Sequence, residues 1–164
     1  MGLSVMLPAP LQRVMPWLIH GSARFTRPLT LGVRAVLTRE GAAGPEVFLV
    51  RHSYVPGWHL PGGAVEAGET VGDAVAREIR EECALAVWGT PELFGLYFNR
   101  AASRRDHVAV FRVRDFAVLG PRAADLEIVE AGFHPVAGLP EATTTATRAR
   151  LGEMLEGRTA SPYW

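Results

Sequence analysis

The chain has 164 residues, of which 48% are apolar and 21% charged, as expected of a folded protein long enough for one domain. Seventeen basic residues balance seventeen acidic ones, so the net charge does not indicate a nucleic-acid polymer as partner. Every basic residue is an arginine, which excludes a lysine nucleophile, a Schiff base and a Walker-type phosphate loop.

The first 28 residues form an apolar arm ahead of the predicted domain, residues 29–164. Apolar side chains recur at helical spacing over residues 9–20, which predicts a short helix that packs on the domain or on a second subunit. The arm lacks the basic start of a secretory signal, and no apolar run reaches the roughly 18 residues of a membrane span. A single cysteine, Cys83, allows no internal disulfide. We therefore expect a cytoplasmic location, no membrane segment and a homodimer.

Residues 29–164 show the pattern of an α/β domain. Val-rich and Leu-rich stretches at 29–38 and 46–52 predict paired strands, and "GWHLPGG" after them predicts an irregular loop. A helix is predicted over 70–83, with Thr70 as N-cap and an apolar side chain at every fourth position. The remaining predicted elements are strands at 92–99, 107–116 and 129–136 and a helix at 144–156. Strands before and after a central helix predict a mixed sheet with helices on its faces.

Three glutamates lie at the end of the central helix. At 100° per residue, Glu78 and Glu82 lie about 40° apart and Glu81 about 60° further round, so the three carboxylates share one face. Such carboxylates repel one another unless a cation lies among them, and Mg²⁺ takes oxygen ligands of this kind. The alternative is a solvated helix face, on which Asp73, Arg77 and Glu81 form pairs at i,i+4 spacing.

The surrounding spacing favours the metal site. Gly63, five residues, Glu69, seven residues and "REIREE" resemble the Nudix box of the Nudix hydrolase family, G-x5-E-x7-R-E-U-x-E-E-x-G-U, with U a bulky aliphatic. Eight of the nine specified positions match: Gly63, Glu69, Arg77, Glu78, Ile79, Glu81, Glu82 and Leu85. The exception is Ala84, where the family has glycine. A left-handed conformation costs alanine about 1 kcal/mol or more, so we expect a slightly altered exit from the helix.

The resemblance implies a Nudix-type α/β/α sandwich with a mixed sheet. It also implies hydrolysis of a nucleoside diphosphate linked to another moiety, in which water attacks phosphorus with the help of Mg²⁺, or Mn²⁺ as a substitute. Glu81 and Glu82 would be primary metal ligands, Glu78 a ligand or general base, and the Gly63 carbonyl a further ligand. By the same resemblance, Arg77 would pair with Glu69 and hold the loop to the helix.

Residues outside the box are candidates for binding the substrate. Arg51 precedes the loop, and Arg104 lies in a short basic stretch, so each could reach a phosphate or remain a surface charge. Asn99 could contact a base through its amide. Glu127 and Glu130 are, with Glu78, candidates for the general base.

Two other functions compete with hydrolysis. A non-catalytic nucleotide sensor could use the same fold, although the four box glutamates argue against it, because a binding module needs no general base. An isomerase of the kind that acts on isopentenyl diphosphate is weaker, since its box usually departs from the hydrolase pattern. The box does not name the leaving group, so the substrate stays open.

Overall fold

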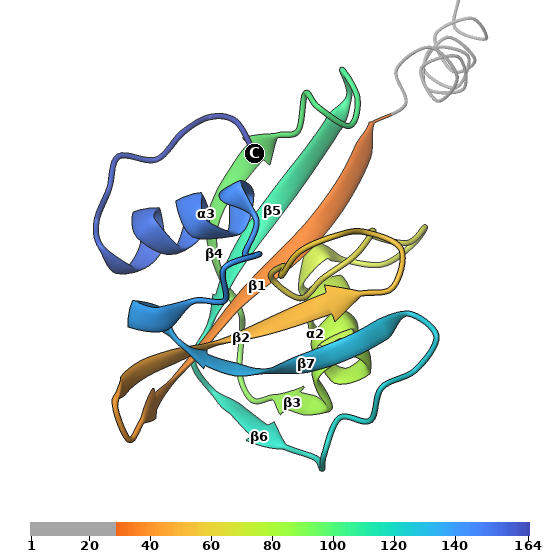
Figure 1. Ribbon diagram of the computed structural model, residues 1–164. Coiled ribbons are helices and arrows are strands. Elements are labelled where there is room, and N and C mark those ends of the chain that lie inside the picture. Colours follow the sequence, from red (N-terminus) through yellow and green to blue (C-terminus); the bar gives the residue numbers. More distant parts are fainter. Residues whose placement is uncertain (1–28) are drawn as a thin grey trace, which may run out of the picture.

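A five-stranded mixed sheet organises the protein, seen in a computed structural model that describes residues 29–164 (Figure 1). Its strands lie in the order β4-β5-β1-β2-β7. They are β1 (Thr30–Gly41), β2 (Gly44–His52), β4 (Glu92–Phe98), β5 (Asp106–Val113) and β7 (Ile128–Pro135). β1 and β5 are parallel and the other neighbours are antiparallel, so the predicted mixed sheet is confirmed. The arm at residues 1–28, with the helix predicted at 9–20, lies outside the described residues.

Two helices cover opposite faces of the sheet. Helix α2 (Val71–Cys83) buries Ala74, Val75 and Ile79 against one side of β1, β2 and β5, whereas α3 (Thr145–Leu155) buries Leu151 and Met154 on the other. A short 3₁₀ turn, η1 (Val136–Gly138), precedes α3. This three-layer arrangement is the predicted sandwich. Neither helix within residues 29–164 has the length and apolar run that a bilayer crossing requires.

Helix α2 begins and ends through local interactions. The Thr70 hydroxyl accepts a hydrogen bond from the Asp73 amide at 3.1 Å, which caps the first turn as predicted. At the other end Ala84 has φ 52° and ψ 40°, a left-handed conformation. The expected altered exit is therefore not seen, because the alanine adopts the backbone that a glycine favours there. Ala84 carries the cost as strain.

A second, two-stranded sheet was not predicted. β3 (Leu85–Val87) pairs with β6 (Phe116–Val118), and β5 ends at Val113, so the strand predicted over 107–116 is two strands separated by Arg114 and Asp115. The Trp88 amide donates to the Asp115 carbonyl at 2.8 Å where the small sheet begins. Strands of three residues carry too little alternation to be recognised in a sequence.

The first half of β1 is hydrogen-bonded to the loop before α2 instead of to β2. We call residues 60–65 the box loop. β2 pairs with residues 38–41 of β1, and the box loop is hydrogen-bonded to the same edge of β1 nearer its N-terminal end, at residues 31–35. Three backbone hydrogen bonds make this join: Val33 N to Gly63 O at 2.8 Å, Ala35 N to Pro61 O at 2.9 Å and Val65 N to Leu31 O at 2.9 Å. The box loop is thereby fixed to the centre of the sheet.

Candidate active site

Arg77 is the centre of an ion-pair network that joins the box loop to α2. Its guanidinium donates to both oxygens of Glu69, at 2.9 and 3.1 Å, in the bidentate geometry that suits an arginine fork. It also donates to Glu78 at 2.7 Å, to Glu81 at 3.3 Å and to the Ala64 carbonyl at 3.0 Å. The hydrogen bonds that Arg77 donates to Glu69 and Glu78 raise the pKa of Arg77, and the same contact with Arg77 lowers the pKa of Glu69.

Two adjacent glycines allow the loop to approach the helix. A Cβ on Gly63 would lie 2.3 Å from Glu78 Oε1, so only a glycine leaves room for that carboxylate. Gly62 has φ 140°, and a Cβ there would lie 2.1 Å from the Val33 carbonyl. The Gly62 amide donates to Glu82 Oε2 at 2.7 Å. The Gly63 carbonyl, predicted to bind a metal, accepts from the Val33 amide and retains one lone pair.

Glu82 is a buried carboxylate whose ionisation is suppressed. Its side chain is 12% exposed, like that of Glu78, whereas Glu81 is 55% exposed. Burial raises the pKa of Glu82 to about 7, and the charge of Glu78 acts in the same direction. The Gly62 amide, Arg34 and Arg122 oppose this shift in pKa. Glu82 is thus poised to change its charge near neutral pH.

Arg34 lies beneath the box loop, where sequence reasoning did not place it. It comes from the middle of β1 and donates hydrogen bonds to the carbonyls of Leu60, at 3.2 Å, and of Gly62. Burial lowers the pKa of Arg34, whereas the charges of Glu82 and Glu78 act in the opposite direction. An arginine in a Val-rich strand looks like a solvent-facing residue in the sequence, so its role became visible only in the fold.

His52 lies beside Glu82 and is neutral. Its Nε2 is 3.6 Å from Glu82 Oε1, and its ring is buried. Burial lowers the pKa of His52 to about 4, and the charges of Arg34 and His59 add to this. Cys83, on the same helix, is buried and has its pKa raised by burial, so its thiol stays protonated and packs in the core.

Arg122 lies at the end of α2, a contact that the box pattern does not include. Its Nε donates to the Glu82 carbonyl at 3.1 Å, where the helix leaves its last carbonyls without intrahelical partners. It also pairs with Asp125 at 2.6 Å, and two backbone amides together with Arg122 lower the pKa of Asp125 to about 2. The segment before β7 is thereby attached to the end of α2.

The donor chemistry of the box fits a divalent cation. Glu78, Glu81 and Glu82 offer carboxylate oxygens, the ligand type that Mg²⁺ and Mn²⁺ prefer. Across residues 29–164 no three His, Cys, Asp or Glu side chains are gathered into a ready-made metal site, and Arg77 holds oxygens of Glu78 and Glu81. The raised pKa of Glu82 beside Glu78 is an electrostatic cost that a bound cation would relieve.

Two cavities flank these carboxylates. The first, of about 260 Å³, which we call the Trp164 cavity, is lined by residues that include Gly32, Arg34, Gly63, Asn99, Asp106 and Trp164. The second, of about 480 Å³, which we call the Tyr54 cavity, is lined by residues that include Arg51, His52, Tyr54 and Pro56. Arg34 and Gly63 connect the first cavity with the box, and His52 connects the second.

The predicted substrate residues fall into separate places. Asn99 lines the Trp164 cavity and Arg51 the Tyr54 cavity, where Arg51 also pairs with Glu130 at 2.9 Å. Glu127 is exposed, and its carbonyl accepts from the Ser53 amide at 2.9 Å, so it borders the loop that carries Tyr54. Arg104 is exposed in the β4–β5 connection and lines neither cavity.

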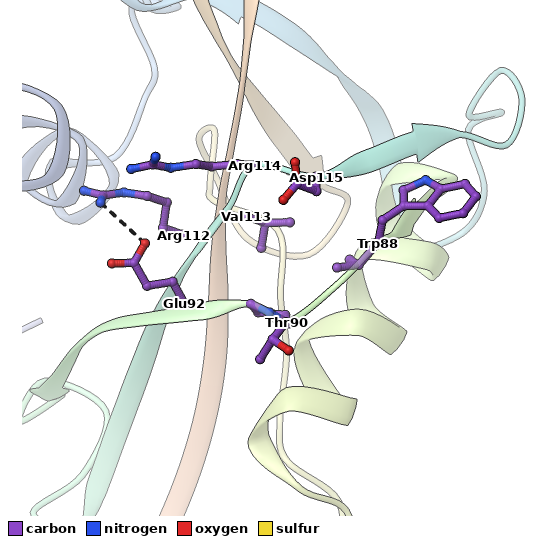
Figure 2. A pocket seen from close by; sticks show the side chains of 9 residues that line it. Trp88, Thr90, Glu92, Arg112, Val113, Arg114 and Asp115 are labelled. Carbon is purple, nitrogen blue, oxygen red and sulfur yellow. Dashed lines mark ion pairs between the residues drawn. The ribbon is translucent and has the colours of Figure 1, made fainter.

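A third cavity, of about 160 Å³, lies away from the box. It is enclosed by the β3–β4 connection and the end of β5 (Figure 2). Glu92 and Arg112 approach to 3.6 Å on one side of it, whereas the Trp88 ring points away from both arginines shown. None of the box residues lines this cavity, so it does not share the carboxylate chemistry.

Comparison with known proteins identifies the family. Residues 28–155 match the NUDIX domain. The chain is 39% identical over 83 residues to an ADP-ribose pyrophosphatase of Methanocaldococcus jannaschii, covering 50% of this chain and 48% of that protein. It is 34% identical over 83 residues to the 8-oxo-dGDP phosphatase NUDT18 of Mus musculus, covering 51% and 25%. The match thus spans half or less of these relatives.

Solved structures show the same fold. A MutT NUDIX hydrolase from Burkholderia pseudomallei superimposes with a TM-score of 0.61 at 27% identity, covering 76% of this chain and 97% of that one. A NUDIX hydrolase from Nitrosomonas europaea has a TM-score of 0.62 at 18% identity, covering 82% and 98%. The box, the sandwich that presents it and the domain match agree, and the chain belongs to the Nudix hydrolase family.

Proposed function

We propose that this protein is a divalent-metal-dependent pyrophosphohydrolase that acts on a nucleoside diphosphate linked to another moiety. The observation that carries the proposal is geometric: Glu78 and Glu82 are each only 12% exposed on one face of α2, and the box loop lies against both, with Gly63 beside Glu78 and the Gly62 amide donating to Glu82. A protein that needed only a stable helix would not bury two acidic side chains there, because burying a carboxylate is costly even where an arginine or a backbone amide offsets part of the cost. The site is arranged for a partner of opposite charge.

The residues of the box would divide the work. Glu78, Glu81 and Glu82 would hold Mg²⁺, or Mn²⁺ in its place, with the free lone pair of the Gly63 carbonyl as a further ligand. Arg77 fixes Glu78 and Glu81 through the hydrogen bonds described above, and the Gly62 amide fixes Glu82. A bound divalent cation supplies neutralisation of phosphate charge and favours ionisation of the attacking water.

The general base would be Glu78 or Glu127. Glu130, the third candidate, is held by Arg51 in an ion pair on the surface of β2 and β7, and Glu78 is held by Arg77, so either would have to leave its arginine to act as the base. Glu78 lies against Gly63 in the box, and Glu127 lies on the segment that borders Tyr54. A base must reach the proton that it removes within hydrogen-bond distance or through one water. Glu78 is one of the box carboxylates, and Glu127 is joined through Ser53 to the loop that lines the Tyr54 cavity.

Similarity to named relatives guides the choice of substrates. One relative is an ADP-ribose pyrophosphatase and another an 8-oxo-dGDP phosphatase, so ADP-ribose and 8-oxo-dGDP head the panel to be tried. Other nucleotide sugars, nucleoside triphosphates and dinucleoside polyphosphates complete it. The cytoplasmic location expected from the single cysteine stays a prediction.

The test is release of phosphate and nucleotide from this panel with Mg²⁺, Mn²⁺ or EDTA. Wild type is compared with Glu81→Gln and Glu82→Gln, which keep the shape of each side chain and remove its charge. Glu141→Gln, which changes an exposed residue ahead of α3, is the matched control. We expect turnover that EDTA abolishes, a loss of two orders of magnitude or more in the two box variants, and none in the control.

The sensor function makes the opposite prediction. A non-catalytic module would show no turnover across the panel, together with nucleotide binding at micromolar concentration that neither box substitution weakens. That pair of results would replace the hydrolase proposal with the sensor. Turnover in EDTA that equals turnover in Mg²⁺ would support a hydrolase and contradict its dependence on a metal.

A further inference from the structure

The chain beyond α3 folds back onto the sheet and ends beside β4 (Figure 1). We call residues 161–164 the tail. Its Pro162 carbonyl accepts from the Phe98 amide at 2.9 Å, and its Trp164 amide donates to the Phe98 carbonyl at 3.1 Å, so the tail is hydrogen-bonded like a strand to the end of β4. The domain match stops at residue 155, and the tail therefore lies outside the part that the family shares.

A buried polar network fixes the tail. Arg150, only 1% exposed, donates to Glu153 at 2.6 Å and to the Tyr163 carbonyl at 2.8 Å. Glu153 in turn accepts from the Tyr97 hydroxyl and the Ser161 amide, both at 2.9 Å. Buried charges are costly unless they are paired and hydrogen-bonded. Here α3 and β4 together hold one short segment through these groups, which indicates that its position matters.

The tail places the Trp164 side chain in a cavity that the box residue Gly63 also lines. Trp164 is half-buried and lines the Trp164 cavity together with Gly63, whose Cα lies against the Glu78 carboxylate. Its ring centre is 6.2 Å from that of Tyr97 in an edge-on contact, and it packs against the core cluster that contains Tyr97. A group bound against Trp164 would therefore be adjacent to a phosphate held at the box.

Fixed polar groups form another wall of the same cavity. The Asn99 amide donates to Asp106 Oδ2 at 2.8 Å, and Asp106 Oδ1 accepts from the Thr30 hydroxyl at 2.6 Å. An aromatic face beside an oriented amide and carboxylate is suited to a flat heterocycle with a polar edge. At about 260 Å³ the cavity is below the roughly 300–1,000 Å³ of sites for whole drug-sized ligands, so it fits one moiety of a substrate.

We propose that the Trp164 cavity binds the base of a nucleotide substrate, with Trp164 as a specificity-determining residue that stacks on it. Asn99 and Asp106 face the polar edge of the base, and the phosphates extend past Gly63 toward the carboxylates. The placement of the phosphates rests on the proposed function. The binding of a base against the tail can be measured without any turnover.

The test compares ligands that differ only in the base. AMP and GMP are titrated into the protein by calorimetry in EDTA, with ribose 5-phosphate as the ligand that keeps the sugar and phosphate and lacks the base. Trp164→Ala should weaken the tighter of AMP and GMP by on the order of 10-fold or more, because stacking on an aromatic side chain contributes substantially per base. It should leave ribose 5-phosphate unchanged.

Two further variants separate stacking from support of the fold. Trp164→Phe keeps an aromatic face and should stay within about threefold of wild type, whereas Trp164→Leu keeps apolar bulk and should resemble Trp164→Ala. Tyr163→Ala is the matched control, because the Tyr163 ring contacts Phe98 and Arg100 and does not line this cavity. Melting temperatures of all four variants identify any loss of folding.

Several results would overturn the proposal. Equal affinity of wild type for ribose 5-phosphate and both nucleotides would mean that no base is bound. Equal weakening of all ligands by Trp164→Ala, or no weakening by Trp164→Leu, would assign the residue to support of the fold. A failed hydrolysis assay is a separate outcome, because it removes the proposed enzyme and leaves the base-dependent difference in affinity intact.

Discussion

Gly62 and Gly63 are neighbours in the chain, yet their Cα hydrogen atoms face different surroundings. A Cβ on Gly63 would meet the end of the flexible Glu78 side chain, whereas a Cβ on Gly62 would meet the backbone of β1. The carboxylate can rotate away and the strand cannot. A substitution at Gly63 therefore tests the position of the Glu78 carboxylate, whereas one at Gly62 tests the packing of the loop on β1.

We predict opposite effects for the two alanine variants. Gly63→Ala should displace Glu78 and lower kcat by about two orders of magnitude, with a melting temperature within a few degrees of wild type. Gly62→Ala should lower the free energy of unfolding by about 2 kcal/mol or more, because it adds a backbone clash at a positive φ. Thermal melts and steady-state kinetics of both variants check this. Equal loss of stability in the two would contradict it.

Glu82 should make stability depend on pH. Its pKa is about 7 in the folded protein against 4.5 as the ordinary value, so the folded state binds more protons between those pH values. Stability from the neutral carboxyl is thus complete below pH 4.5 and is lost as pH rises through 7. At 1.36 kcal/mol per pKa unit, the loss amounts to at most about 3 kcal/mol.

Glu82→Gln removes that dependence. In EDTA the variant should gain stability relative to wild type on going from pH 5 to pH 8, measured by urea denaturation at both values. Glu81→Gln, at an exposed position, is the control and should show a much smaller change. Mg²⁺ at pH 8 should stabilise wild type more than Glu82→Gln. If the free energies of unfolding of wild type and Glu82→Gln differ by the same amount at both pH values, the raised pKa of Glu82 is contradicted.

Among the elements, α2 was the most predictable and the small sheet the least. The cap at Thr70 and the apolar repeat are local, and the helix begins within a residue of the predicted start and ends at Cys83. β3 and β6 are three residues long and pair across the chain, from Leu85 to Val118. They form only because two segments distant in the sequence pair with each other, and a short apolar run does not reveal its partner.

The site divides in the same way. The spacing of the box brings Glu78, Glu81 and Glu82 together on one helix face, and that much follows from helical geometry. Arg34 and Trp164 reach the site only through long-range folding, one from beneath the box loop and one from the tail. Their residue types carry no motif, so they were invisible in the sequence.

At the end of α2, a glycine should be preferred to Ala84. Ala84→Gly relieves the left-handed strain of roughly 1–2 kcal/mol but adds freedom to the unfolded chain, so we expect a net gain of up to about 1 kcal/mol in the free energy of unfolding. Turnover should change by less than tenfold, because the carboxylates keep their positions. Urea denaturation and kinetics measure both, and a tenfold rise in turnover would show that the helix end limits catalysis.

For the whole molecule, the apolar arm at residues 1–28 predicts a homodimer. Light scattering at micromolar concentration should give about twice the chain mass of 17.8 kDa for the full chain. A variant that begins at residue 29 should give a monomer, since the arm is the proposed contact. A monomer mass for the full chain would remove the prediction, and a dimer of the shortened chain would move the contact to the domain.

One edge of β1 is hydrogen-bonded partly to β2 and partly to the box loop, and this arrangement affects how the protein folds. The same strand carries the box loop, whose Gly62 lies 28 residues from Arg34, and the parallel partner β5, whose Asp106 lies 76 residues from Thr30. Closing the shorter loop costs less chain entropy, so the box loop can join β1 before β5 arrives. The box loop would then be an early part of the folding nucleus, and a substitution such as Gly62→Ala would slow folding more than it speeds unfolding.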